Sequence, residues 1–236
     1  MLCFLTVYNQ LTWPRAMAAE CVRLGLTPIL VDNASTYQPL LDWYADKAAC
    51  PYEVLRRDVN GSCYGFFRAG WHYRINEPFI LSDSDLDLSG VPTDCVEHMR
   101  YLMDEHPEVT KVGLSLEIND LPDHNVFKPN VVKHESRYWL DGYRLISPKD
   151  GVPAVYRAGV GATFAMYYPS RRDKIDKDFY NALRMERPYT ARHLPWYLDL
   201  TPGKLSEELE YYYRSCDNIA HWGHQYRDHL KRLETQ

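Results

Sequence analysis

Apolar and polar residues follow one another along the first half of the chain in blocks that predict alternating strands and helices. Short apolar runs bounded by turn residues are typical of buried strands, and longer segments with apolar residues every three or four positions are typical of amphipathic helices. Strands are predicted at residues 2–7, 27–31 and 52–56, and helices at 15–24 and 37–47. This order predicts a mostly parallel sheet with right-handed crossover connections.

The alternation continues to about residue 140. The next predicted elements are a helix at 63–73, a strand at 78–82, a helix at 92–105, a strand at 109–118 and a helix at 131–140. The sequence contains neither an internal repeat nor a low-complexity linker. We therefore expect one α/β domain over residues 1–236.

The pattern is less regular in the second half of the chain. The turn signal Lys-Asp-Gly at 149–151 predicts a hairpin between the apolar segments 143–146 and 152–168. Residues 188–199 contain too many prolines and aromatic residues for a helix. Two helices are expected after them, one that begins at Ser206 and runs to about Cys216 and a charged one after His224.

Three alternating carboxylates follow the strand predicted at 78–82, in the segment 83–87 with the sequence Asp-Ser-Asp-Leu-Asp. In an open α/β sheet, ligands bind beyond the carboxyl ends of the strands, which is where Asp83 and Asp85 are expected to lie. Carboxylate oxygens combined with substrate phosphates are the usual ligands of Mg2+ and Mn2+. The same residues would also suit a turn or the start of a helix, because Asp and Ser are favoured in both.

Polar and charged residues also follow the second and third predicted strands. Asp32 begins the segment Asp-Asn-Ala-Ser at 32–35. Its carboxylate offers two acceptors that suit a base N–H or ribose hydroxyls, and the segment equally suits an Asx turn. Arg56, Arg57 and Arg68 have guanidinium groups able to pair with phosphate, although exposure to solvent is the more common role of a single arginine.

The polar motifs occur in a particular order. Tyr8-Asn9 follows the first strand, Asp-Asn-Ala-Ser at 32–35 follows the second, Asn60-Gly61 precedes a helix and Asp-Ser-Asp at 83–85 follows a strand. In this order and spacing they resemble glycosyltransferases of the GT-A fold, especially family 2-like enzymes. The resemblance covers the first half of the chain. It implies an α/β GT-A fold, with a mostly parallel central sheet flanked by helices and a mixed acceptor-side half.

The resemblance also implies a division of labour along the chain, with a nucleotide-sugar-binding half at 1–105 and an acceptor-side half with C-terminal helices at 106–236. In this family the segment after the second strand holds the base and ribose, and the Asp-x-Asp motif holds ribose and the divalent metal on the diphosphate. Asp85 is then a direct metal ligand, Asp83 contacts ribose, the metal or a metal-bound water, and Asp87 has a structural role. The expected donor-binding residues are Tyr8, Asn9, Asp32, Asn33, Arg56, Asn60, Gly61, Arg68 and Asp83.

A histidine late in the chain often supplies a further metal ligand in GT-A enzymes. His193, His221 and His224 are the candidates, and His193 is the one we expect. Neutral imidazole is a good metal ligand. A histidine among aromatic residues is, however, more often a hydrogen-bonded packing residue.

An inverting transferase needs a carboxylate that takes the proton of the acceptor hydroxyl. We expect Asp123 or Asp199 in this role, because both lie in the aromatic, proline-bearing segments predicted on the acceptor side. Residues 159–162 read Gly-Val-Gly-Ala where a family 2 enzyme would carry a Glu-Asp pair. The sequence therefore leaves open whether transfer inverts or retains the configuration at the sugar's anomeric carbon. A turn role is the alternative for each of the candidate bases, which are Asp120, Asp123, Asp173, Asp176 and Asp199.

Composition narrows the class of protein. With 236 residues, 45% hydrophobic and 25% charged, the chain has globular values and no apolar run of membrane-spanning length. Its formal charge of −5 argues against binding driven by neutralisation of nucleic-acid phosphates. The N-terminus lacks a basic lead, and the six cysteines show no paired metal spacing, so reduced thiols and a cytoplasmic location are expected.

The function predicted from these residues and the resemblance is a metal-dependent hexosyltransferase. It would use Mn2+ or Mg2+ and move a hexose from a nucleoside diphosphate sugar, a UDP-sugar first of all, to a hydroxyl acceptor such as a saccharide or glycoconjugate. Aromatic residues, 14% of the chain, would line the acceptor side. The alternatives are a nucleotidyltransferase that makes such sugars, which should carry a glycine-rich loop absent from residues 8–15, and a non-catalytic nucleotide- or sugar-binding module.

Overall fold

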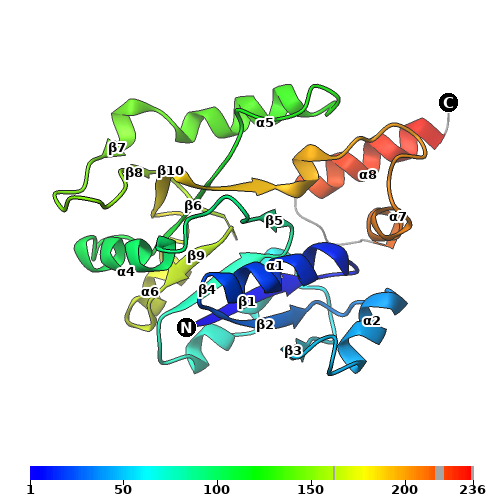
Figure 1. Cartoon of the computed structure of the whole chain (residues 1–236), viewed down its shortest axis with the longest axis horizontal. Helices are drawn as coiled ribbons and strands as arrows, with labels where there is room; N and C mark the ends of the chain where they lie inside the picture. The colour runs from blue at the N-terminus through cyan, green and yellow to red at the C-terminus, as the bar shows by residue number, and fades with distance from the viewer. Residues whose placement is uncertain (162, 216–220, 235–236) are drawn as a thin grey trace.

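The computed structural model describes residues 1–161, 163–215 and 221–234, which form helices around one mixed sheet (Figure 1). The strands are β1 (Leu2–Val7), β2 (Thr27–Asp32), β3 (Glu53–Arg56), β4 (Phe79–Asp83), β5 (Leu86–Asp87), β6 (Lys111–Leu116), β7 (Arg144–Leu145), β8 (Val155–Arg157), β9 (Ala165–Tyr167) and β10 (Ala182–His193). Within the sheet their order is β3-β2-β1-β4-β9-β6-β10-β8-β7, and β5 pairs with β10.

The first half of the chain builds the parallel part of the sheet. Strands β3, β2, β1 and β4 are neighbours and run parallel, so that their carboxyl ends meet at one edge. Strand β9 runs antiparallel to both β4 and β6, and β10 is parallel to β6 and antiparallel to β8. The predicted α/β class is therefore confirmed, with a parallel core and a mixed second half.

Helices cover both faces of the sheet. They are α1 (Thr12–Arg23), α2 (Gln38–Ala45), α3 (Gly65–Arg68), α4 (Cys95–Glu105), α5 (Lys128–Glu135), α6 (Arg172–Lys177), α7 (Glu207–Ser215) and α8 (His221–Glu234). The buried sides of α1, α2 and α4 contribute Met17, Leu40 and Met99 to one apolar cluster. Helices α3 and α6 contribute Phe66 and Ile175 to another. Strands β1 and β2 point toward the end of the molecule where α7 and α8 lie (Figure 1).

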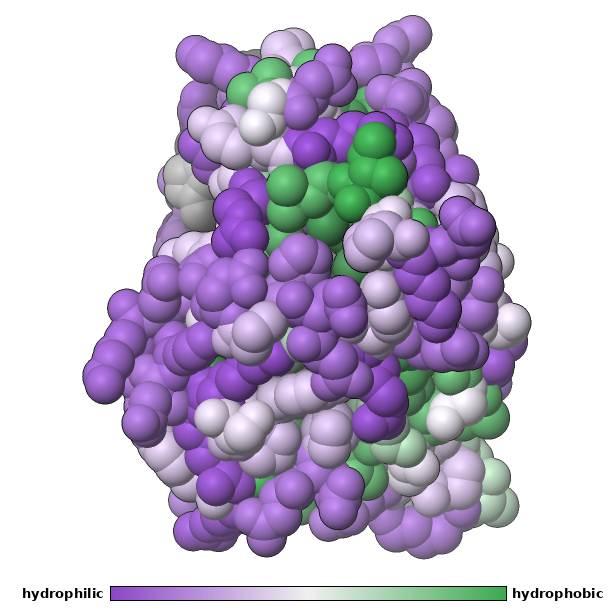
Figure 2. Space-filling view, turned by 90° about the vertical axis from the view of Figure 1, so that its left-hand side faces the viewer, coloured by the Kyte–Doolittle hydropathy of each residue, from purple (hydrophilic) through white to green (hydrophobic). Residues whose placement is uncertain are grey.

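The opposite end of the molecule carries α4 and the β7–β8 hairpin. Figure 2 shows that its surface is mostly hydrophilic and includes one apolar patch in the upper half of the view. Strands β7 and β8 pair antiparallel, with Arg144 opposite Tyr156, so the hairpin predicted around residues 149–151 is confirmed.

The prediction of a single helix at 63–73 is wrong. A 3-10 turn at Ser62–Tyr64 leads into the short helix α3, and a second 3-10 turn follows at Trp71–Arg74. Gly70 lies between them with a φ of +69°, a left-handed conformation that ends a right-handed helix. This segment is therefore a series of turns beside β4.

Strand β10 was not predicted at all. It begins at Ala182, and its pairing with β6 shifts register between Met185 and Thr190, around Pro188. A proline cannot donate to a sheet ladder and is tolerated at such an irregularity. Residues 188–199 contain no α-helix, as expected. They form the end of β10 and then a 3-10 turn at Leu194–Tyr197.

The remaining boundaries differ by a few residues. Helix α1 begins at Thr12 and α5 at Lys128, earlier than predicted, and α5 gives way to a 3-10 turn after Glu135. The helix expected from Ser206 is α7, where the Ser206 hydroxyl accepts a hydrogen bond from the amide N–H of Leu209 at 3.4 Å. Its predicted end at Cys216 lies outside the described residues.

Candidate functional site

A cleft opens at the carboxyl ends of β1, β2 and β4. Its lining is mostly polar and comes from the ends of β1 and β4 and from the segments that follow β1, β2, β3 and β4, with one residue each from β10 and α7. It encloses about 90 Å³ and opens to solvent. The lining residues are Thr6, Tyr8, Gln10, Asn33, Asn60, Ser62, Cys63, Asp83, Ser84, Asp85, His193 and Tyr212.

Asp83 and Asp85 reach this cleft from the end of β4. Asp83 is the last residue of the strand and lies opposite Thr6 of β1. The Asp85 carboxylate lies 3.4 Å from Nε2 of His193, measured from its Oδ2 atom. The sequence prediction that these carboxylates stand at the rim of the sheet is borne out by their positions.

Buried polar atoms without partners lie at this rim. Among the described residues, Oδ1 of Asp85, Oγ1 of Thr6 and Nδ1 of His193 are buried and have no hydrogen-bond partner. An unsatisfied buried polar group costs about 1–3 kcal/mol, so such groups are rare unless a ligand completes them. A ligand bound at this rim would complete these three atoms.

The charge environment of Asp83 points to a cation. Burial and the negative charge of Asp85 raise the pKa of Asp83 well above its ordinary value, and the charge of Lys111 opposes the shift. Lys111 is itself fully buried, donating to the carbonyl of Gly161 at 3.0 Å and to the hydroxyl of Tyr167 at 3.2 Å. A bound cation would oppose this shift and favour the charged form of Asp83.

The donor set fits a hard divalent ion that is shared with a substrate. Within residues 1–161, 163–215 and 221–234, no three His, Cys, Asp or Glu side chains converge to hold a metal ion. Mg2+ and ions like it are commonly bound by one or two carboxylates together with substrate phosphates. Asp83 and Asp85, with the unpaired Oδ1 atom of Asp85, meet that requirement.

His193 is the histidine that the structure brings to the carboxylates. Its ring packs on Trp196 with the centroids 4.7 Å apart, which agrees with the alternative role of a packing residue, and its role as a metal ligand stays a prediction. His224 lies on α8, outside the cleft lining, and its Nδ1 atom is 2.9 Å from Arg227. The His221 side chain lies outside what the structure describes.

Asn33 and the loop at 60–62 form a second wall of the cleft. The Asn33 amide donates to the carbonyl of Ser62 at 3.2 Å, and its Oδ1 atom accepts from Arg57 at 3.1 Å. A Cβ atom at Gly61 would lie 1.8 Å from Nη1 of Arg57 and 2.6 Å from Cα of Gly65, so only glycine fits there. This close packing explains the Asn-Gly sequence.

Three loops of the cleft hold strained backbone. Asn9, Ala34 and Ser62 have φ values of 48°, 62° and 58°, in the left-handed region that non-glycine residues seldom occupy. Each follows or borders a strand end that reaches the cleft. Such strain costs about 1–3 kcal/mol per residue and clusters at ligand-binding sites.

Asp32 and Arg56 hold one of these loops together. The Asp32 side chain is fully buried, and its Oδ2 atom accepts from the amide of Ser35 and from Nε of Arg56, each at 3.1 Å. The Tyr44 hydroxyl donates to its Oδ1 atom at 3.4 Å. The Asp32 carboxylate thus holds its own loop through the amide of Ser35, three residues further on, and lies outside the cleft lining; a contact with a donor stays a prediction.

Other predicted donor-binding residues also form hydrogen bonds to neighbouring segments of the protein. The Asn9 side chain is buried and donates to Oγ of Ser215 at 2.9 Å, while Tyr8 lines the cleft and donates to the carbonyl of Ser215 at 3.2 Å. Arg68 lies over the Tyr64 ring and 3.4 Å from the carbonyl of Gly61. Of these, the structure brings Tyr8 into the cleft itself.

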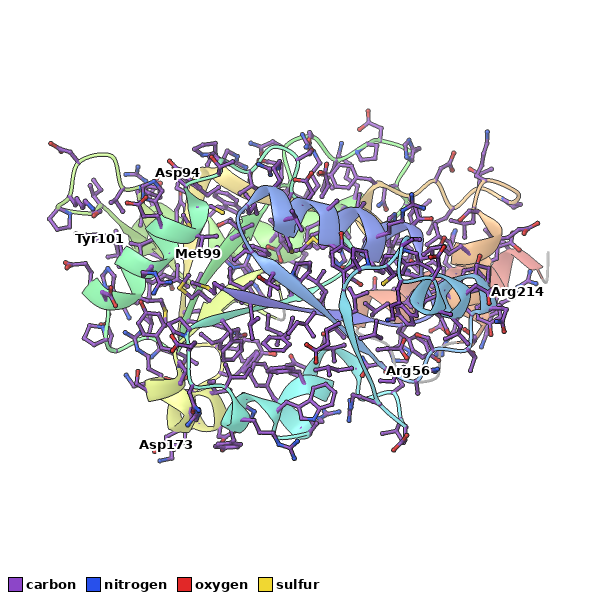
Figure 3. All side chains as sticks on the ribbon, turned by 60° about the horizontal axis from the view of Figure 1, so that its bottom comes forward. Arg56, Asp94, Met99, Tyr101, Asp173 and Arg214 are labelled. Atoms are coloured by element: carbon purple, nitrogen blue, oxygen red, sulfur yellow. The ribbon has the colours of Figure 1, made fainter. Side chains whose placement is uncertain are left out.

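The predicted catalytic bases lie elsewhere. Asp123 is fully exposed and pairs with Lys128 at 2.7 Å, and Asp199 accepts from the amide of Thr201 at 3.0 Å. Asp120 is paired with Arg192. In Figure 3, Asp173 lies at the lower left of the view, apart from Arg56 at the lower right. None of the five candidate bases lines the cleft in the described structure, and their proposed roles stay predictions.

Helix α7 closes one side of the cleft. Tyr212 lines it and packs against Tyr8 with the ring centroids 6.2 Å apart. Glu208 fixes the helix by accepting from the backbone amides of Leu11 and Thr12 at 2.7 and 2.9 Å. Sequence patterns did not identify Tyr212 as a site residue, nor Thr6, Gln10, Ser62, Cys63 and Ser84. Gln10 and Ser62 directly follow identified motifs, and Ser84 lies inside one.

No protein-family model and no curated protein sequence matches the chain. Solved structures of GT-A glycosyltransferases match it over most of its length. S. aureus TarS 1-349 shares 12% identity, covers 82% of this chain and 60% of its own and has a TM-score of 0.49. The mannosyltransferase PcManGT from Pyrobaculum calidifontis, in complex with GDP-Man and Mn2+, shares 13% identity over 91% of this chain and 60% of its own, with a TM-score of 0.44.

Mouse xyloside xylosyltransferase 1 shares 12% identity over 76% of each chain, with a TM-score of 0.34. What these proteins share with the chain is the fold. The chain spans about 60% of the length of the TarS fragment and of PcManGT. No helix in the described part of the chain is long and apolar enough to span a membrane.

Proposed function

We propose that this protein is a metal-dependent glycosyltransferase that moves a hexose from a nucleoside diphosphate sugar, a UDP-sugar first of all, to a hydroxyl acceptor. The observation that carries the proposal is the pair of carboxylates at the end of β4, in a cleft that is also lined by Thr6, where the Oδ1 atom of Asp85 and the hydroxyl of Thr6 are buried and unpaired. A divalent cation and a diphosphate together complete these groups. A neutral sugar alone would leave two half-buried carboxylates without a counter-charge.

Asp85 and Asp83 would hold Mn2+ or Mg2+, with Asp85 as the direct ligand. Bound there with the diphosphate, the ion supplies positive charge that stabilises the leaving nucleoside diphosphate. His193, which also lines the cleft, orients the Asp85 carboxylate from a distance of 3.4 Å. The carboxylate pair is thus fixed before the donor arrives, which is the arrangement that electrostatic catalysis requires.

The remaining cleft residues position the donor. With about 90 Å³ enclosed, the cleft is smaller than the roughly 300–1,000 Å³ of sites that bury a drug-sized ligand. The diphosphate therefore lies inside it, and the base and sugar extend along its open side. Asn33 and Asn60 on one wall and Tyr8 and Tyr212 on the other offer amides, hydroxyls and aromatic rings to them.

The two halves of the chain take the two substrates in this proposal. Residues 1–105 supply most of the donor site, and residues 106–236, with C-terminal helices, form the acceptor side. Asp123 or Asp199 would reach the acceptor only after a movement of its loop, because both are exposed outside the cleft. A cytoplasmic location also remains part of the proposal.

The start of α1 argues against a nucleotidyltransferase. Residues 8–15 contain no glycine, and the backbone amides of Leu11 and Thr12 at the start of α1 already bind the carboxylate of Glu208. A phosphate loop would need these amides for its anion. The diphosphate is therefore better accommodated at the end of β4.

The proposal predicts that nucleoside diphosphates stabilise the protein only when a divalent cation is present. Ligands that bind the native state raise its melting temperature by mass action. UDP and GDP, followed by UDP-GlcNAc and GDP-mannose, which are bound in two of the matched structures, should raise Tm with Mn2+ and not with EDTA. Thermal denaturation measures this, and an equal shift in EDTA for every nucleotide would contradict the role of the metal.

A further inference from the structure

A second cavity lies on the other side of α7, between α7, α8 and the segment at 201–205, and encloses about 600 Å³. One part of its lining is apolar and is formed by Leu205, Tyr213, Leu230 and Leu233. Tyr213 is only 2% exposed and stacks on Tyr226 with centroids 5.8 Å apart and an interplanar angle of 13°. The stacked, buried Tyr213 ring therefore forms part of an apolar wall of the cavity.

The other part of the lining is cationic. Arg214, Arg227 and Lys231 line the cavity together with one acidic residue, Glu210. Glu210 lies 3.6 Å from Arg214, and Arg227, with 21% of its side chain exposed, lies 3.8 Å from Asp228, which is outside the lining. The whole chain carries a formal charge of −5, whereas the residues that line the cavity include three cations and one carboxylate. The lining is therefore more positive than the chain as a whole. Figure 3 shows Arg214 at the end of the molecule formed by α7 and α8.

A ligand that satisfies both parts must join an anionic group to an apolar tail. Guanidinium groups pair with phosphate through two parallel hydrogen bonds, and a lysine ammonium adds a compact charge. Burial of an alkyl chain against leucine and tyrosine side chains supplies the hydrophobic contribution, about 25 cal/mol per Å². The cavity volume of about 600 Å³ lies within the range typical of small-molecule sites.

We propose that this cavity, lined by Leu205, Tyr213 and Leu230 on one side and by Arg214, Arg227 and Lys231 on the other, binds an amphiphile with an anionic phosphate head and an alkyl tail. The site is separate from the cleft. Tyr212 of α7 lines the cleft, whereas Tyr213 and Arg214 of the same helix line the cavity. The proposal therefore stands whether or not the cleft binds a nucleotide sugar.

The test is isothermal titration of the full chain with decyl phosphate, at concentrations below those at which it forms micelles. Inorganic phosphate and decyl maltoside, which carry the head charge and the tail separately, are titrated in parallel. We expect saturable binding of decyl phosphate that is at least about tenfold tighter than that of either comparison compound, because only decyl phosphate uses both parts of the lining.

Charge variants test the cationic wall. Lys231→Gln, at an exposed position, and the double variant Arg227→Gln/Lys231→Gln should weaken decyl phosphate binding about 10-fold and about 100-fold, since hydrogen bonds to charged groups are the strong ones. Arg232→Gln is the matched control on the same helix, because Arg232 does not line the cavity. Circular dichroism and Tm measure whether each variant is folded. If the double variant does not fold, the comparison of Lys231→Gln with Arg232→Gln tests the proposal by itself.

Three results would overturn the proposal. One is that inorganic phosphate binds as tightly as decyl phosphate, which would leave the apolar wall without a role. Another is that decyl maltoside binds as tightly, which would make the cations irrelevant. The third is that Lys231→Gln and Arg232→Gln have equal effects. Vesicles of phosphatidylcholine with and without phosphatidic acid then distinguish a membrane lipid from a free amphiphile as the source of the phosphate.

Discussion

Asp85→Asn should weaken the binding of Mn2+ together with a nucleoside diphosphate by at least about 100-fold, the upper end of the loss seen when even an indirect partner of a metal ligand is removed. The substitution keeps the shape of the side chain and removes its charge. It leaves Asp83 as the one carboxylate of the pair at the rim of β4. The signal of free Mn2+ in electron paramagnetic resonance measures the affinity with UDP or GDP present.

Asp87→Asn is the matched control for this variant. Asp87 lies two residues further along the same segment, accepts from the amide of Ser89 at 2.8 Å and is 3.6 Å from Arg192. It does not line the cleft. Its affinity for Mn2+ and nucleotide should stay within about twofold of the unmodified protein. Equal binding by Asp85→Asn and the unmodified protein would remove Asp85 from the metal site.

Glu135→Gln should lower the free energy of unfolding by about 3–5 kcal/mol, because it leaves a buried arginine without its counter-charge. Glu135 and Arg184 form an ion pair at 2.7 Å, with only 3% and 5% of their side chains exposed. Arg184 also donates to the carbonyl of Gly159 at 2.7 Å. A loss of this size corresponds to a fall in Tm of roughly 10 °C for a chain of this length.

Asp123→Asn provides the contrast, because Asp123 pairs with Lys128 but its side chain is fully exposed. Its Tm should not change measurably, since exposed ion pairs contribute little to stability. Denaturant titration and calorimetry of both variants make the comparison. A Tm for Glu135→Gln equal to that of Asp123→Asn would show that the pair does not stabilise the fold. Activity of Asp123→Asn tests at the same time whether this residue is the catalytic base.

The parallel half of the sheet could be predicted because its strands are nearly continuous apolar runs. Strand β1 occupies the predicted residues 2–7, and β2, β3 and β4 agree with prediction to within a residue or two. Once the strands are parallel, their carboxyl ends must share an edge. That rule placed Asp83 and Asp85 at one rim without any knowledge of tertiary contacts.

Other features depend on contacts between distant residues and have no local signal. Tyr212 reaches the cleft because Glu208 binds the start of α1, almost two hundred positions earlier in the chain. Strand β10 is rich in arginine and contains a proline, which local patterns favour outside sheets. Asp32 has the residue type of a binding group, yet Arg56, Ser35 and Tyr44 occupy its oxygens.

The carboxylate pair at the end of β4 is the centre of this account, and donor turnover tests it most directly. The protein, supplied with a radiolabelled nucleotide sugar, should release the nucleoside diphosphate by slow hydrolysis, or faster with a hydroxyl acceptor, in the presence of Mn2+. Release should stop in EDTA and in Asp85→Asn, and persist in Asp87→Asn. Donor binding with no release under any of these conditions, or release that is unaffected by EDTA and by Asp85→Asn, would contradict the account.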